Sequence, residues 1–254
     1  MCYYKIILLF YSKIFVLANY YFNLKLLSIR GNIDLIYITG DLHGDISRFA
    51  KIRLKKSDTL IVCGDFGFVW CEDKAAQKNI KKIGNLPFKV LFVDGTHENF
   101  DLLKEYPKEN FAGSVARHIS GNLYQLLRGN IYNIEGKTFF AFGGGEAIDK
   151  DMRRVYNMYW DEEMPSIDEM KMGVDNLNKV GRKVDYVITH EPPAKIKGLF
   201  YEKTDSINTL NRFFDDVSKY VVYEKWFFGS IHKDRTIPPK YIGLFTSVVN
   251  LEDA

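Results

Sequence analysis

After the first thirty-odd residues, short apolar runs alternate with segments that repeat apolar residues at helical spacing. The runs 35–39, 59–63 and 89–93 have the length and composition of buried strands. Segments 46–55 and 74–83 lie between them and read as helices. Repeated strand–loop–helix units are typical of βαβ connections, so the pattern predicts an α/β domain with a largely parallel sheet.

The second half of the chain continues this alternation. Residues 131–142 read as a hairpin that turns at Glu135 and Gly136. Ser166 and Glu169 have the spacing of a capping box, which predicts a helix from there to about Val180. Further elements are expected as strands at 185–189, 225–228 and 242–249 and as a helix at 209–220. No repeat, low-complexity tract or Pro/Gly-rich linker interrupts the sequence, so one domain is expected over 34–254.

The first 33 residues differ from the rest and form an N-terminal extension of uncertain status. Residues 3–22 are rich in Ile, Leu, Phe and Tyr, with Lys5 and Lys13 as their charges. A membrane anchor is one interpretation, since a spanning helix needs about 20 apolar residues. A signal peptide is another, but Lys13 interrupts the apolar stretch in both cases. We favour a non-native extension or a segment that packs on the domain, with membrane contact through residues 1–30 as the minor alternative.

Composition changes this picture little. The 46% hydrophobic and 26% charged residues are ordinary for a globular protein, and a net charge of +3 gives no reason to expect a stable nucleic-acid partner. The three cysteines, Cys2, Cys63 and Cys71, form no C-x-x-C pair. A disulfide framework is therefore not expected, and a reducing, cytoplasmic location fits best.

The chemistry of the chain is concentrated where its predicted strands end. Five segments share one pattern, in which an apolar strand is followed by a turn and then by Asp, His or both. In parallel sheets, functional groups gather at the carboxyl ends of the strands. Four of the five histidines fall in these segments, His118 being the exception. The residues concerned are Asp41, His43, Asp65, His97, His190 and His232.

Mixed carboxylate and imidazole groups favour a transition-metal site. Asp41 and His43 stand two residues apart, so on an extended segment their side chains point the same way and can bind one ion. Asp with His suits Mn²⁺, Fe or Zn²⁺ better than Ca²⁺. Taken alone, Asp65 reads as a turn residue and His190 as a structural histidine. The order and spacing of all five segments are what indicate a site.

This arrangement resembles the calcineurin-like metallophosphoesterases, whose motifs read D-x-H, G-D, G-N-H-D/E, H and G-H-x-H. The similarity covers about residues 36–249. It implies a four-layer α-β-β-α sandwich of two mixed sheets. It also implies a metal-dependent phosphoesterase that hydrolyses a phosphomonoester or phosphodiester by attack of a metal-activated hydroxide.

The resemblance further implies roles for single residues. Asp41, His43 and His232 would bind a first ion, Asp65 would bridge two ions, and His190 would bind the second. His97 would act as general acid or orient the phosphate. Mn²⁺ is the expected cofactor, with Fe, Ni or Zn as alternatives.

Two positions depart from the family pattern, Thr96 in place of Asn and Ser230 in place of the first His of G-H-x-H. Both positions normally ligate the second ion, and hydroxyls are weak ligands, so the second ion is expected to be weakly bound or absent. An oxygen of Glu191, Glu98 or Glu146 could substitute for a missing ligand. The D-R-G continuation of protein Ser/Thr phosphatases is missing after Gly64, which argues against a phosphoprotein substrate.

The substrate side of the site is less defined. After the glycines at 143–145, Lys150 and Arg153 resemble a segment that lies near the active site in bacterial and phage members, and either could contact the substrate phosphate. A surface loop with solvated charges is the equal alternative. Phe66, Phe68 and Trp70 could line a pocket for a base or could belong to the core.

These observations lead to two hypotheses of different class. The first is a hydrolase of a small phosphoester, with a nucleotide-like ester as one option, which the six retained Asp and His residues favour. The second is a degenerate member that binds a metal ion or a phosphorylated ligand with little or no turnover, which Thr96 and Ser230 favour.

Overall fold

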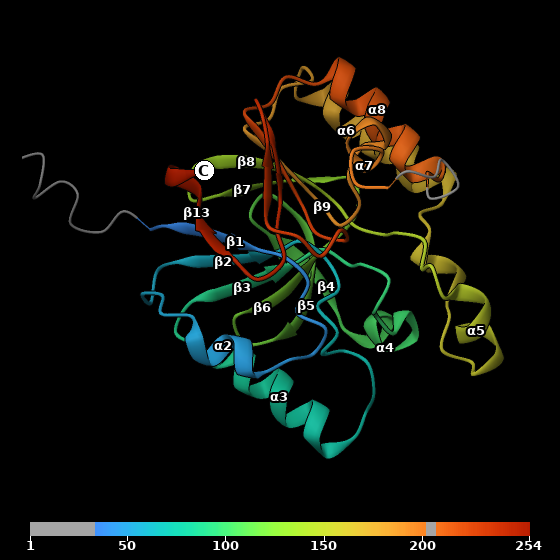
Figure 1. The fold of residues 1–254 in the computed structure, drawn as a ribbon. Coiled ribbons are helices and arrows are strands. Elements are labelled where there is room, and N and C mark those ends of the chain that lie inside the picture. Colours follow the sequence, from blue (N-terminus) through green and yellow to red (C-terminus); the bar gives the residue numbers. More distant parts are fainter. Residues whose placement is uncertain (1–33, 202–206) are drawn as a thin grey trace, which may run out of the picture. The chain divides into compact units, whose positions relative to one another are not determined.

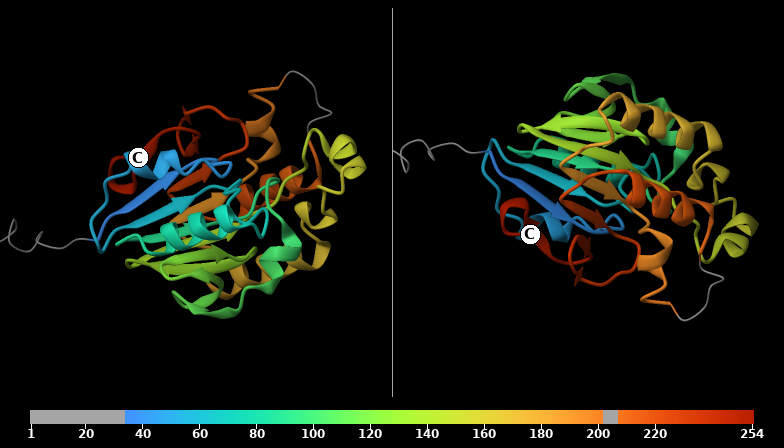
Figure 2. Two further views of the ribbon diagram at one scale, coloured as in Figure 1. Left: turned by 90° about the horizontal axis from the view of Figure 1, so that it is seen from below. Right: turned by 90° about the horizontal axis from the view of Figure 1, so that it is seen from above.

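Two mixed β-sheets lie face to face at the centre of the structure, and helices cover their outer sides (Figure 1). This computed structural model describes residues 34–201 and 207–254. Residues Leu35–Ala254 form one compact unit. Figure 2 shows the same arrangement from below and from above, with helices lying over the strands in each view. The α/β sandwich expected from the family resemblance is confirmed, whereas a single largely parallel sheet is not.

The first sheet has seven strands among the described residues, in the order β13-β1-β2-β3-β6-β5-β4. Strands β1, β2, β3 and β6 run parallel, and the antiparallel pairs are at the edges. Its strands are β1 (Ile36–Thr39), β2 (Thr59–Val62), β3 (Lys89–Phe92), β4 (Lys108–Phe111), β5 (Ser114–Ser120), β6 (Leu123–Leu126) and β13 (Val248–Asn250).

The second sheet has six strands among the described residues, in the order β11-β12-β10-β9-β8-β7. Strands β12, β10, β9 and β8 are parallel, and β7 and β8 form the expected hairpin across Glu135 and Gly136. Its strands are β7 (Asn130–Ile134), β8 (Lys137–Phe142), β9 (Tyr186–Thr189), β10 (Lys225–Phe228), β11 (Arg235–Ile237) and β12 (Tyr241–Gly243).

The helices occupy two separate layers and the ends of the sheets. The capping box predicted at Ser166 and Glu169 is confirmed at the start of α6. No helix among residues 34–201 and 207–254 combines the length and apolar composition that a membrane span needs, and the question raised by residues 3–22 lies outside the described residues. The helices are α2 (Ser47–Lys51), α3 (Lys74–Gly84), α4 (Phe100–Glu105), α5 (Lys150–Val155), α6 (Ile167–Lys179), α7 (Ala194–Lys197), α8 (Thr209–Tyr220) and the 3₁₀ helices η1 (Asp161–Glu163) and η3 (Leu251–Asp253).

Side chains that alternate along the buried strands pack in turn between the two sheets and against the outer helices. On β2, Ile61 packs between the two sheets, whereas Leu60 and Val62 face the α2 and α3 layer. On β10, Phe227 packs between the sheets and Trp226 faces the α6 to α8 layer. Because successive strand side chains point to opposite faces, strands buried on both faces are apolar throughout, which is why they were recognisable in the sequence.

Two predicted elements were wrong in extent. The helix predicted over 46–55 ends at Lys51, because Ile52 is extended and the Asp58 carboxylate accepts hydrogen bonds from the N–H groups of Leu35 and Lys55. This fixes the chain between helix and strand in a non-helical path.

The strand predicted over 242–249 is two strands in different sheets, β12 and β13. The turn between them is held by Asp234, whose carboxylate accepts the backbone N–H groups of Phe245 and Ser247 and the hydroxyl of Thr246. The chain passes from one sheet to the other at this turn.

Candidate metal centre

The loops after four parallel strands meet at one edge of the two sheets. Asp41 and His43 follow β1, and Asp65 follows β2. From the second sheet, His190 follows β9 and His232 follows β10. Parallel neighbours end at the same edge, so residues far apart in the sequence come together there.

Four of these side chains form a cluster able to hold a cation. Asp41, His43, Asp65 and His232 each offer one ligand atom, and these atoms lie within 4.8 Å of one another. Asp41 Oδ2 is 3.0 Å from His232 Nε2, and Asp65 Oδ2 is 3.8 Å from His43 Nδ1. The carboxylates are buried and both imidazoles are exposed, so the cluster opens to solvent on its histidine side.

The two exposed imidazoles face each other. His43 Nε2 lies 3.1 Å from His232 Nε2. Two neutral imidazole lone pairs at this distance would repel, so the arrangement needs either a shared proton or a shared cation between the rings. A ligand pair for one ion has this geometry.

His190 extends the cluster beneath the surface. Its Nδ1 is 3.1 Å from the carbonyl oxygen of Cys63, to which it can donate, and its Nε2 is 3.5 Å from Asp65 Oδ1. A donated Nδ1–H leaves the Nε2 lone pair free, which is the usual arrangement of a metal-ligating histidine held by a backbone carbonyl. The His190 ring is therefore oriented so that its Nε2 could bind a cation beside Asp65.

His97 approaches from the opposite side of Asp65. Its Nδ1 is 2.7 Å from Asp65 Oδ2, and its backbone N–H donates to Asp65 Oδ1 at 2.8 Å. Thr96 also donates from its backbone N–H to Asp65 Oδ1, and its hydroxyl is 3.3 Å from that oxygen. Asp65 is thus surrounded by donors, and the His97 ring is held with its other nitrogen available.

The backbone of the centre is strained where the ligands lie. His43, Asp65, Ser230 and His232 all have positive φ, between 44° and 52°. Non-glycine residues rarely adopt this conformation, which costs about 1–3 kcal/mol each, and such strain is typical of functional sites. Gly229 adds a close approach, because a Cβ there would overlap Asp41 Oδ1 and the carbonyl oxygen of Cys63.

Burial and neighbouring charges shift the pKa values of the titratable groups in opposite directions. Burial alone would raise the pKa of Asp65, but His190 and the hydrogen bond from His97 hold it well below its usual range. Burial lowers the pKa of His43. The Asp41 carboxylate beside its ring raises the pKa of His232. The centre thus holds the Asp65 carboxylate in its ionised form, which is the form that binds a metal ion.

Two buried oxygens test whether a cation fits here. Among the described residues, no hydrogen-bond donor is placed in good geometry to Asp41 Oδ2 or to the hydroxyl oxygen of Ser230. A buried anionic oxygen without donors is costly, and a bound cation would satisfy it. The donor set of carboxylate and imidazole also fits a divalent transition metal.

The sequence model of the calcineurin-like phosphoesterase family matches residues 35–230, well over half of the 254 residues. The chain belongs to the calcineurin-like phosphoesterase family. A comparison with curated proteins returns no match. The match together with the Asp/His cluster gives the chain a metal-dependent phosphoesterase domain at the level of the family.

Thr96 and Ser230, the two predicted departures from the family pattern, lie at the cluster. Thr96 contacts Asp65, as described above, and the backbone N–H of Ser230 is 3.3 Å from Asp41 Oδ1. The three glutamates considered as substitutes have other partners. Glu98 accepts the Phe66 N–H, Glu191 pairs with Lys197, and Glu146 pairs with Lys150.

Lys150 and Arg153 were predicted to contact the substrate phosphate. In the structure both side chains contact other protein groups. Lys150, the first residue of the protruding α5 (Figure 1), forms an ion pair with Glu146 in the preceding loop. Arg153 is buried, and its guanidinium lies 2.7 Å from Glu163 and over the ring of Trp70. A contact of either residue with a substrate phosphate stays a prediction.

Two residues that support the phosphoesterase centre were missed in the sequence. Arg48 on α2 donates to the carbonyl oxygens of Asp41 and Phe245, which ties the first ligand loop to the turn before β13. Phe245 in turn stacks on His232 at 4.8 Å between ring centroids. An arginine on a helix carries no motif, and only the tertiary contacts reveal this role.

Proposed function

We propose that this phosphoesterase hydrolyses a small phosphomonoester or phosphodiester. The observation that carries the proposal is the convergence of Asp41, His43, Asp65 and His232 within 4.8 Å, with His97 beside Asp65. A bound divalent cation, Mn²⁺ first among Mn²⁺, Fe, Ni and Zn, would activate a water and neutralise phosphoryl charge.

The residues of the chain would divide the remaining work. Asp41, His43, Asp65 and His232 bind the cation, and His190 would hold a second one more weakly because Thr96 and Ser230 provide hydroxyls in place of an amide and an imidazole. His97 would donate a proton to the leaving oxygen, since its Nδ1 is fixed against Asp65 and its Nε2 is left for the substrate.

A second function has a specific observation in its favour. The Thr96 hydroxyl lies 3.3 Å from Asp65 Oδ1 and 3.2 Å from His97 Nδ1, so it can bond to protein groups that a second ion would use. A chain that binds one ion or a phosphorylated ligand without useful turnover would have this arrangement.

One experiment separates the two functions. The protein is stripped of metal, Mn²⁺ is added back, and hydrolysis of chromogenic phosphomonoesters and phosphodiesters is followed beside the Asp65→Asn variant. Mn²⁺-dependent turnover that the substitution abolishes supports the hydrolase. Folded protein that holds about one ion per chain but turns over no ester with Mn²⁺, Fe²⁺, Ni²⁺ or Zn²⁺ contradicts it.

A further inference from the structure

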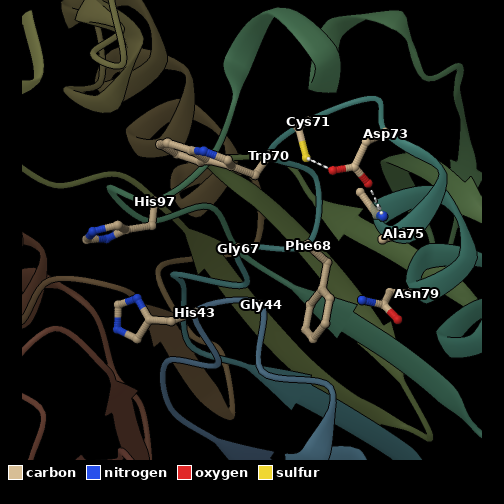
Figure 3. Close-up of a pocket in the computed structure, with 11 residues that line it drawn as sticks. His43, Gly44, Gly67, Phe68, Trp70, Cys71, Asp73, Ala75, Asn79 and His97 are labelled. Atoms are coloured by element: carbon tan, nitrogen blue, oxygen red, sulfur yellow. Dashed lines mark hydrogen bonds between the residues drawn. The ribbon is translucent and has the colours of Figure 1, made fainter. Parts of the chain in front are cut away.

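A cavity of about 410 Å³ opens directly beside the metal centre. His43 and His97 line its near side, and Phe68, Trp70 and Asn79 line the remainder together with the start of α3 (Figure 3). Pockets for small organic ligands have volumes of about 300–1,000 Å³. A phosphoryl group at the cluster would leave this cavity for the organic part of the ester.

We propose that this pocket binds that organic group, and that the group is a flat, uncharged ring system of nucleoside size, selected by Trp70 and Asn79. The inference rests on the proposed function, because the cluster defines where the phosphoryl group lies. The proposed pocket determines which esters the enzyme accepts. It can be wrong even if the protein hydrolyses phosphoesters.

The charges around the pocket disfavour an anionic group. Among the described residues that line it there is no Lys or Arg, and Asp73 supplies a full negative charge at the far end from the histidines. The N-terminus of α3 does not compensate, because Asp73 already caps it by accepting the Ala76 N–H at 2.7 Å. Polyphosphate or sugar-phosphate leaving groups would meet repulsion here.

The aromatic walls are held rigidly, which favours a flat ligand. Phe68 is buried and packs against Phe49 and Phe66. The Trp70 ring has the Arg153 guanidinium over one face at 5.7 Å and Trp160 edge-on at 5.6 Å. A preformed aromatic wall loses little entropy on binding, so a ring that stacks or packs edge-on gains about 0.5–1.5 kcal/mol beyond its buried area.

Asn79 supplies the polar contact that a heterocycle needs. Its side chain projects from α3 toward the pocket, opposite His43 and His97 (Figure 3). Among the described residues, no hydrogen bond involves its side-chain amide. That amide offers both a donor and an acceptor, a pair that matches the edge of a nucleobase.

Cys71 provides a readout that does not depend on turnover. It lines the pocket and is exposed, whereas Cys63 is buried. The full-length protein is alkylated with iodoacetamide at increasing adenosine concentration, and labelling of the Cys71 peptide is followed by mass spectrometry. Ribose 5-phosphate is the matched probe, because it carries charge and the sugar but no flat aromatic ring.

Adenosine is expected to slow Cys71 alkylation at millimolar concentration, and ribose 5-phosphate is expected to leave it unchanged. Trp70→Leu and Asn79→Ala should each raise the half-protecting adenosine concentration at least fivefold. Gln77→Ala, on the same helix but outside the pocket lining, is the matched control and should not. Equal protection by both probes, or protection that survives both pocket substitutions, overturns the proposal.

Comparison with the turnover assay separates the failure of the ring-binding pocket from the failure of the proposed phosphoesterase activity. Turnover without nucleoside protection would leave the phosphoesterase activity standing and overturn the ring-binding pocket. Protection without turnover on any metal would support the pocket and contradict the hydrolase. When both hold, adenosine monophosphate should be hydrolysed with at least a tenfold higher kcat/KM than glycerol phosphate.

Discussion

His97 is the residue whose role depends most on its neighbour. Its Nδ1 lies 2.7 Å from Asp65, which leaves Nε2 as the nitrogen that faces a substrate. We expect His97→Gln to lower kcat about 10²–10⁴-fold for an alkyl phosphoester, whose leaving oxygen needs a proton, and much less for a p-nitrophenyl ester. Steady-state kinetics on the two esters measure the difference.

Metal content serves as the control for that prediction. His97 lies outside the four-residue cluster, so the His97→Gln variant should bind as much Mn²⁺ as the wild-type protein. An equal loss of rate on both esters would show that His97 does not act as a general acid.

Gly229 allows the ligand loops of the two sheets to meet. A Cβ at this position would overlap Asp41 Oδ1 and the Cys63 carbonyl oxygen, so Gly229→Ala should displace the Asp41 carboxylate. We expect at least a tenfold loss of Mn²⁺ affinity, measured by titration calorimetry. Gly198→Ala is the matched control, because a Cβ there would be 3.5 Å from its nearest neighbour. Unchanged affinity in Gly229→Ala would contradict this account of the centre.

For single residues, the sequence predicts the site where the functional residues are close together in the chain. Asp41 and His43 form a motif within three residues, and the turn glycines beside them mark the strand ends. Arg48 and Asn79 are different, because each becomes relevant only through another segment: Arg48 donates to the Phe245 carbonyl oxygen, and Asn79 lines the same pocket as Trp70. A single sequence does not encode such neighbours in any local pattern.

Among the elements, most strands with buried faces on both sides were predicted, although β6 was missed, and strands whose burial depends on a polar partner were not predicted. Strands β4 and β5 were missed because β4 is largely exposed and β5 contains Arg117 and His118. Arg117 is buried by pairing with Gln125 on β6 at 3.0 Å, a contact that the alternation of apolar residues does not reveal. The split of β12 from β13 likewise depends on Asp234, eleven residues before Phe245.

A buried ion pair joins several elements behind the centre. Arg128, between β6 and β7, pairs with Asp94 after β3 at 2.6 Å and with Glu169 on α6 at 3.3 Å. Arg128→Met would leave the buried Asp94 charge without its partner, and we expect a loss of about 3–5 kcal/mol in the free energy of unfolding. Urea denaturation measures it.

Arg154 offers the matched control for this prediction. Its pairs with Asp151 and Asp161 are exposed, so Arg154→Met should change the free energy of unfolding by less than about 1 kcal/mol. Equal effects of the two substitutions would mean that burial does not set the strength of the Arg128 pair.

The short η1 helix contributes a pH-dependent element. Burial raises the pKa of Glu163 to about 7 from 4.5, against the attraction of Arg153 and His97, and the Asp65 charge adds to the rise. The folded state therefore holds this proton more tightly than the unfolded chain. The resulting stabilisation is complete below pH 4.5 and is lost as the pH rises through 7.

Glu163→Gln should remove this dependence. We expect the wild-type protein to lose free energy of unfolding relative to the variant between pH 5 and pH 8, at no more than about 1.4 kcal/mol per pH unit. Urea denaturation of both proteins across this range measures the loss. Parallel curves for the two proteins would exclude a raised pKa at Glu163.

For the whole molecule, the centre is a junction between the two sheets. Asp41, His43 and Asp65 follow strands of the first sheet, and His232 follows β10 of the second. A cation bound by all four would connect the sheets in the folded state alone, so Mn²⁺ at 100 times its Kd should add about 2.7 kcal/mol to the free energy of unfolding.

Asp41→Asn tests that linkage without removing the fold. The variant should gain little from Mn²⁺, and thermal unfolding with and without the ion measures the gain for both proteins. A wild-type unfolding temperature that does not respond to millimolar Mn²⁺ would argue against a metal that joins the sheets.

The pairing of β1 with β13 has a consequence for how the protein is made. β1 holds Asp41 at its end, yet one of its two neighbours lies at Val248–Asn250, and the contact of Asp41 with Ser230 spans 189 residues. At about 5–20 residues per second, a ribosome needs roughly 10–40 s to cover that distance. Throughout that interval the nascent chain carries Asp41 and His43 without His232. A cation held by all four side chains can therefore bind only after His232 has been added to the chain.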